Sequence, residues 1–105
     1  MTTQFIVATI SEEMQIEFDP FKRDKTLTER GLDFAHAAQV FLGQHLTLED
    51  TRENYDEQRF QTVGWLNGRI VILIWTPRGT ARRIISMRKA NERETAKIRA
   101  ALGRP

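Results

Sequence analysis

Apolar residues near the start of the chain follow a spacing of two. Met14, Ile16 and Phe18 alternate with polar residues, which predicts a half-buried strand. The run from Gln4 to Ile10 is mostly apolar and is typical of a second short strand before it. The chain therefore begins with strand signals rather than helical ones.

Two helices are expected next, because the spacing changes at Asp19-Pro20. Aspartate caps free amides and proline tolerates the first helical position, so we expect a helix from Pro20 to Glu29 that stops at Arg30-Gly31. Asp33 is the expected cap of a second helix that ends at Gly43. Four apolar residues share one face of that helix: Phe34, Ala37, Ala38 and Phe41. His36 lies opposite that face, which predicts an exposed histidine.

A hairpin is the clearest structural prediction. Phe60 to Leu66 alternates, Asn67-Gly68 is the preferred two-residue turn of type I′, and Arg69 to Thr76 is the return strand. This register places Phe60 opposite Trp75. His45 to Leu48 is a further short strand candidate, and the acidic segment from Glu49 to Glu57 is expected to be a solvated loop.

The stretch from Arg82 to Glu94 is expected to be a strand that leads into the last helix. The sequence does not fix the register of this strand, so either Arg82 or Arg83 faces a ligand. Asn91 and Glu94 form a capping-box pattern, which gives Glu94 a structural role. The expected order is β-α-α-β-β-β-α, an α+β fold with helices packed on one face of a small antiparallel sheet. The length of 105 residues suits one domain with a single modest core.

Charge divides the chain into two unlike parts. Residues 1–68 hold six Lys and Arg against twelve Asp and Glu, whereas residues 69–105 hold ten against two. A protein polarised in this way can steer an anionic ligand to one side, and nucleic acid is the natural candidate. The alternative is a basic strand edge that only discourages aggregation.

Several function classes are disfavoured by what the sequence lacks. It has no cysteine, so it has no disulfide framework or thiolate metal site. The acidic segment lacks the ligand spacing of a calcium loop, and no P-loop, Rossmann or Ser-His-Asp signature is present. The apolar run from Ile70 to Trp75 is too short to cross a bilayer. We expect a cytoplasmic protein that uses no metal or cofactor.

Four motifs occur together in an order that resembles the BrnT family of bacterial toxins. They are Asp19-Pro20-Phe21-Lys22, Gly31-Leu32-Asp33-Phe34 with Ala37-Ala38 and Phe41, Arg59 before Val63-Gly64, and Arg83 to Ala90 with Arg93-Glu94. The resemblance covers roughly residues 14 to 98. Since members usually begin near the position of Met14, it implies that residues 1–13 are an extension, with or without a short strand, and that residues 14–105 form one domain. It implies a RelE-like fold, ribonuclease activity that arrests translation, and a BrnA-type antitoxin partner with a ribbon-helix-helix domain that carries the promoter binding.

Two positions depart from the family pattern. Members commonly have Lys-His before the glycine, where this chain has Glu29-Arg30, and many carry a tyrosine where this chain has Ile98. A histidine can exchange a proton at neutral pH, whereas arginine stays protonated. The departure at Arg30 therefore bears on activity more than on fold.

The residues expected to carry the chemistry are four cations and one carboxylate. RNA cleavage needs a base, cations for the phosphorane charge and an acid for the leaving oxygen. The set is Lys22, Arg59, Arg83, Arg88 and Glu94. Glu94 is the expected base, with Lys22 as the alternative. Two other readings stay open: a binding module whose arginines hold nucleic acid without cleavage, and a structural protein that meets only its partner.

Overall fold

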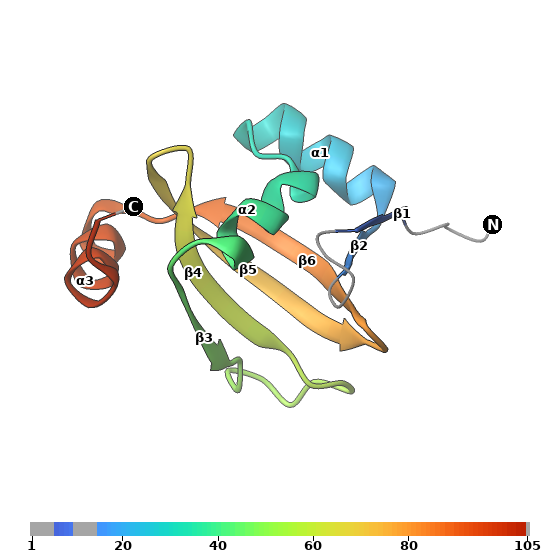
Figure 1. Ribbon diagram of the computed structural model, residues 1–105. Helices are drawn as coiled ribbons and strands as arrows, with labels where there is room; N and C mark the ends of the chain where they lie inside the picture. Colours follow the sequence, from blue (N-terminus) through green and yellow to red (C-terminus); the bar gives the residue numbers. More distant parts are fainter. Residues whose placement is uncertain (1–5, 10–14, 105) are drawn as a thin grey trace.

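The computed structural model describes residues 6–9 and 15–104. Its centre is a sheet with strand order β1-β2-β6-β5-β4-β3, with β1 and β3 at opposite edges (Figure 1). The strands are β1 Ile6–Thr9, β2 Gln15–Phe18, β3 His45–Glu49, β4 Phe60–Leu66, β5 Arg69–Arg78 and β6 Ala81–Lys89. The helices are α1 Pro20–Arg30, α2 Ala37–Leu42, the 3₁₀ turn η1 Phe34–His36 before α2, and α3 Glu92–Leu102.

The α+β class is confirmed, but two details of the expected topology are wrong. β2 pairs with β6 in parallel, while the other strand pairs are antiparallel. A parallel partner needs a long connection, and here it contains the helices and three strands. The candidate strand over His45 to Leu48 is confirmed as β3, so four strands follow α2 where the expected order had three. The strand β1 bears out the expected early strand over Ile6–Thr9; the remainder of that expected strand and Met14 lie outside the described residues.

The hairpin is confirmed residue by residue. Phe60 pairs with Trp75 and Leu66 with Arg69, as the two-residue turn requires. Asn67 and Gly68 both have positive φ, 52° and 77°, which is the conformation of a type I′ turn. The two-residue turn alone is therefore sufficient to predict the register of this hairpin.

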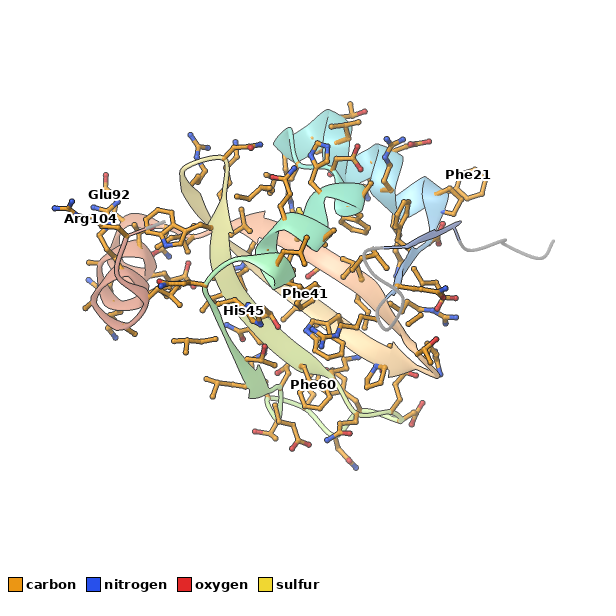
Figure 2. The ribbon with its side chains drawn as sticks, in the orientation of Figure 1. Phe21, Phe41, His45, Phe60, Glu92 and Arg104 are labelled. Carbon is orange, nitrogen blue, oxygen red and sulfur yellow. The ribbon has the colours of Figure 1, made fainter. Side chains whose placement is uncertain are left out.

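One face of the sheet, the helix-covered face, carries the hydrophobic core. Phe18 meets the Phe34 ring edge-on, and Phe41 and Phe60 both contact Trp75. Phe41 and Phe60 lie near each other over the middle strands (Figure 2). The buried indole of Trp75 donates to Thr62 Oγ1 at 2.7 Å, so the polar atom inside this core is satisfied.

Gly64 lies where α2 crosses β4. A Cβ built on this glycine would sit 2.8 Å from Val40 Cγ1, so the helix can approach the sheet only because the side chain is missing. The expected second helix is accordingly present, although its first turn is 3₁₀, with Asp33 accepting from the Ala35 amide. His36 is exposed, as expected.

Among the described residues, the opposite face of the sheet, which we call the open face, is covered at one end by α3. Ile98 of α3 lines a groove with Val63 and Ile72, and the Arg99 guanidinium lies over the Trp65 ring. These residues alternate with the core residues along β4 and β5 and so point to the other side. The expectation that all helices pack on one face is therefore wrong. The reason is that β6 leads directly into α3, which folds back beneath the sheet.

Helix α1 begins and ends as its sequence predicts but buries none of its residues. Asp19 accepts from the Phe21 amide, and Gly31 ends the helix with φ 69°. Phe21 is 70% exposed and points away from the ribbon (Figure 2). Two arginines fix the helix instead: Arg23 donates twice to Asp33, at 2.9 and 2.8 Å, and Arg30 donates to the Met87 carbonyl at 2.9 Å.

Candidate nucleic-acid interface

A β-bulge in β6 decides which arginine reaches the open face. Ile74 pairs with Ser86 and Trp75 with Ile84, so Ile85 has no opposite residue. Arg82 consequently lies on the helix-covered face, where its guanidinium stacks 4.5 Å from the Phe41 ring centroid and 4.8 Å from that of Trp75. Burial lowers the Arg82 pKa.

Arg83 lies on the open face instead. It pairs with Thr76 of β5 on one side and with Glu17 of β2 on the other. The Arg83 guanidinium donates to Glu17 Oε1 at 2.9 Å. Continuing the register of β4 by one residue places Arg59 opposite Thr76, so a row of polar side chains crosses the sheet from Arg59 to Glu17.

Three of the five expected site residues meet at one cavity, which we call the cationic pocket. Lys22, Arg59 and Arg83 line this cavity of about 170 Å³. Its other lining residues are Asp19, Glu57, Ile84 and Ile85. Lys22 comes from the first turn of α1, Arg59 from the residue before β4, and Arg83 from β6. The fold therefore gathers cations that are far apart in the sequence.

Arg59 has an unusual environment for a cation. Its guanidinium lies 4.2 Å from the Tyr55 ring centroid. Its Nε is buried and has no hydrogen-bond partner among the described residues. A buried donor without a partner is costly, and such a donor in a pocket is typical of a site that awaits an acceptor.

Arg88 and Glu94 form a separate pair. The two terminal guanidinium nitrogens of Arg88, Nη1 and Nη2, each donate to one oxygen of the Glu94 carboxylate at 2.8 Å. The Asn91 amide donates to Glu94 Oε1 at 2.9 Å. The bond from Arg88, together with that from Asn91, lowers the Glu94 pKa to about 2. The same pair raises the Arg88 pKa. The predicted capping box is confirmed.

The two groups of expected site residues lie at different places on the open face. Arg88 follows Arg83 by five residues on β6, which corresponds to roughly 15 Å along a strand. Glu94 is therefore not beside the cationic pocket. Its low pKa and its occupied oxygens also make it a weak proton acceptor, so the geometry favours Glu94 as a positioning residue for Arg88.

The acidic segment is more ordered than a solvated loop. Asp50 is buried, and its carboxylate accepts from Arg52 at 2.8 and 2.9 Å. The Arg52 side chain and amide, aided by Tyr55, lower the Asp50 pKa to about 2. Glu57 forms an ion pair with Arg78 and lines the cationic pocket. The sequence analysis missed Glu57, although its position two residues before Arg59 was a usable signal.

Arg30 occupies the position where the family commonly has histidine. Arg30 donates to the Met87 carbonyl. This carbonyl lies on the part of β6 that extends beyond its pairing with β2, which ends at Ile84. Arg30 also lines a cavity of about 190 Å³ with Lys22 and Ser86, next to the cationic pocket. This arginine therefore has a structural role and lies close to a cation of the candidate site.

Within the described part of the chain, no group of three or more His, Asp or Glu side chains has a geometry suited to a metal ion. None of the described helices is long and apolar enough to cross a membrane.

These features define a small α+β protein whose open sheet face can hold an anionic ligand. A family model described as the ribonuclease toxin BrnT of type II toxin-antitoxin systems matches residues 18–94. That match spans most of the chain, so the chain belongs to the BrnT family. A search of curated proteins gave no match. The resemblance seen in the four sequence motifs is thus confirmed, and membership in a type II system implies an antitoxin partner.

Proposed function

We propose that this protein is a metal-independent RNA endonuclease of the cytoplasm that arrests translation and is neutralised by a BrnA-type antitoxin. The observation that carries the proposal is the cationic pocket, with three cations and the unpaired Nε of Arg59. Arginine presents a planar fork of donors that matches phosphate geometry. The pocket combines three cations with the apolar side chains of Ile84 and Ile85, and the cations suit a phosphodiester.

In the proposed reaction the ribose 2′-OH gives up its proton and attacks the adjacent phosphorus, and the bond to the 5′-oxygen breaks. The 5′-oxygen takes up a proton from water, which leaves a 2′,3′-cyclic phosphate and a 5′-hydroxyl. Arg59 and Arg83 would neutralise the charge that develops on the phosphorane, and Lys22 would hold a non-bridging oxygen. Stabilisation of this kind is usually the largest single contribution to catalysis. Arg88, held by Glu94, would bind a phosphate further along the RNA.

The proton of the 2′-OH needs an acceptor near the cationic pocket. Glu57 and Asp19 are the two carboxylates that line the pocket, and Asp19 already caps α1. We therefore assign the acceptor role to Glu57 ahead of Glu94, because Glu57 lines the pocket, and its ion pair with Arg78 would open as the RNA binds. Lys22 is the alternative that the sequence offered. General base catalysis contributes typically about 10²- to 10⁴-fold, so the assignment can be measured.

The proposed antitoxin would inhibit by covering the same surface. A partner that buries the cationic pocket needs acidic or hydrogen-bonding groups opposite Arg59 and Arg83, because unpaired buried charge is expensive. We propose that its ribbon-helix-helix domain binds promoter DNA, and that the toxin reaches the promoter only through it. An antitoxin docked elsewhere, with the pocket open, would contradict this part of the proposal.

Purified protein incubated with labelled RNA in EDTA tests the activity. The proposal predicts cleavage that persists in EDTA and yields fragments with 2′,3′-cyclic phosphate ends. Salt-dependent RNA binding without cleavage would favour the second candidate function, an impaired binding module. That outcome would point to Arg30, which cannot exchange a proton as the family histidine can.

A further inference from the structure

The strand β3 forms an edge of the sheet that nothing in the described part of the chain covers. β3 pairs on one side only, with β4, and is last in the strand order. Natural proteins protect such edges with proline, lysine, bulges or a covering element. β3 reads His-Leu-Thr-Leu-Glu and pairs with β4 in an unbroken register, so it has none of the first three devices.

The edge of β6 beyond the end of β2 is treated differently. Where β2 ends, the edge of β6 would be open, and there the Arg30 side chain donates to the Met87 carbonyl. The Arg30 side chain of α1 therefore provides a hydrogen bond to one backbone carbonyl of that edge. The contrast makes the bare edge of β3 a surface that fits a partner strand.

The direction of the backbone groups on β3 follows from one hydrogen bond. The Asp50 amide donates to the Arg59 carbonyl at 2.8 Å, so Asp50 and Arg59 form a hydrogen-bonded pair at the end of the β3–β4 ladder. Such pairs alternate with non-bonded pairs in an antiparallel ladder. The amides and carbonyls of His45, Thr47 and Glu49 consequently point outward, away from β4.

We propose that a second copy of this chain occupies the edge, with the two β3 strands antiparallel and centred on Thr47. In that register the outward groups of Thr47 meet those of Thr47 of the partner subunit, and His45 meets Glu49 of the partner subunit. All the outward amides and carbonyls of the strand are then paired. A shift of the register leaves some of them without a partner.

The side chains of β3 support the same register. Leu46 and Leu48 lie on the open face and are 44% and 72% exposed. Centring on Thr47 places each leucine opposite the other leucine of the partner subunit, so four leucines form one apolar cluster. That cluster adjoins the groove lined by Ile98 of α3.

Charge also favours a copy of the same strand. His45, at the start of β3 beside Phe41 (Figure 2), would face the carboxylate of Glu49 of the partner subunit on the helix-covered face. The strand carries its basic and acidic residues at opposite ends, which is self-complementary only in the antiparallel arrangement. The interface is therefore isologous and closes as a twofold dimer.

The dimer would leave the candidate site accessible, because β4 and β5 separate β3 from Arg83 on β6, and the side chain of Arg59 lies on the open face rather than at the strand edge. Dimerisation is thus independent of the proposed ribonuclease activity, and its failure would not affect that proposal.

Sedimentation of the full chain, made by cell-free synthesis, tests the proposal at tens of micromolar. The wild type is expected to sediment as a dimer. Thr47→Pro removes an amide N–H that points away from β4 and therefore makes no hydrogen bond in the β3–β4 ladder. The change should weaken dimerisation by more than about tenfold. The circular dichroism spectrum should remain that of the folded protein. Leu48→Lys, at an exposed position, is the second variant and should weaken the dimer as well.

Cysteine crosslinking tests the register, since the chain has no cysteine of its own. Thr47→Cys should form a disulfide-linked dimer on oxidation, because hydrogen-bonded partners in such a ladder lie about 5.5 Å apart between Cα atoms. His45→Cys is the matched control and should not, since the two sites would be roughly 14 Å apart. A monomeric wild type, a dimer that both Thr47→Pro and Leu48→Lys leave intact, or equal crosslinking of the two cysteine variants would overturn the proposal.

Discussion

Replacing Arg83 with alanine should reduce RNA cleavage about 100- to 1000-fold, the usual cost of losing one well-placed charge donor. Arg82→Ala is the matched control, because Arg82 is the adjacent residue with the same charge but lies on the helix-covered face. We expect the Arg82 variant to retain its rate within a few-fold. The bulge at Ile85 and the resulting orientation of the two arginines are the basis of this contrast.

The size of the effect can be compared with the cost to folding. A 100- to 1000-fold loss corresponds to roughly 2.7 to 4 kcal/mol of transition-state stabilisation. Removing Arg83 also leaves Glu17, whose side chain is 13% exposed, without that ion pair, at a cost of about 1 to 3 kcal/mol in stability. Removing Arg82 forfeits two cation–π contacts, worth about 0.5 to 1 kcal/mol each. The two variants therefore lose similar stability and differ in activity.

Initial cleavage rates with excess protein, measured beside thermal melting curves, separate the two effects. Glu17→Gln adds a further control, since it breaks the ion pair and keeps the Arg83 guanidinium. Equal loss of activity in Arg82→Ala and Arg83→Ala at matched folded fractions would refute the assignment of the open face as the RNA-binding face.

Three further outcomes are expected. The pKa of Glu94 is lowered from 4.5 to about 2. Its ionised form therefore contributes stability above about pH 4.5, and this contribution is lost as the pH falls toward 2. In urea titrations the difference in unfolding free energy between wild type and Glu94→Gln should shrink over that range. Glu57→Gln should lower the cleavage rate by about 100-fold or more. Glu94→Gln should have a smaller effect, because it only loosens the position of Arg88, and the reverse order of the two variants would restore Glu94 as the base. Gly64→Ala should lower the free energy of unfolding by about 1 to 3 kcal/mol, because the new Cβ would lie 2.8 Å from Val40 Cγ1. An unchanged denaturation midpoint would contradict the close packing of α2 on β4.

Local chemistry explains which parts of the fold were predictable. The Asn67-Gly68 turn, the Asp19 cap and the Asn91 capping box each depend on a few neighbouring residues, and each was confirmed. The parallel pairing of β2 with β6 depends on how distant segments meet, which no local pattern encodes. The position of α3 on the open face likewise follows from the path of the chain after β6.

Only part of the candidate site could be predicted from the sequence, because it too depends on how distant segments meet. The bulge at Ile85 shifts the alternation of β6, so the sequence left Arg82 and Arg83 undecided. The convergence of Lys22 and Arg59 on Arg83 comes from tertiary packing. Glu57 was missed because a run of acidic residues in a loop is usually solvated, whereas here Asp50 is buried and Glu57 lines the pocket and pairs with Arg78.

Induced expression of the chain alone, beside an Arg59→Ala/Arg83→Ala double variant, tests the central claim most directly. Growth and bulk RNA integrity are followed together, with the amount of folded protein measured in each culture. The account predicts growth arrest with RNA decay for the wild type and relief of both in the variant. Normal growth and intact RNA, with abundant folded wild-type protein, would contradict it.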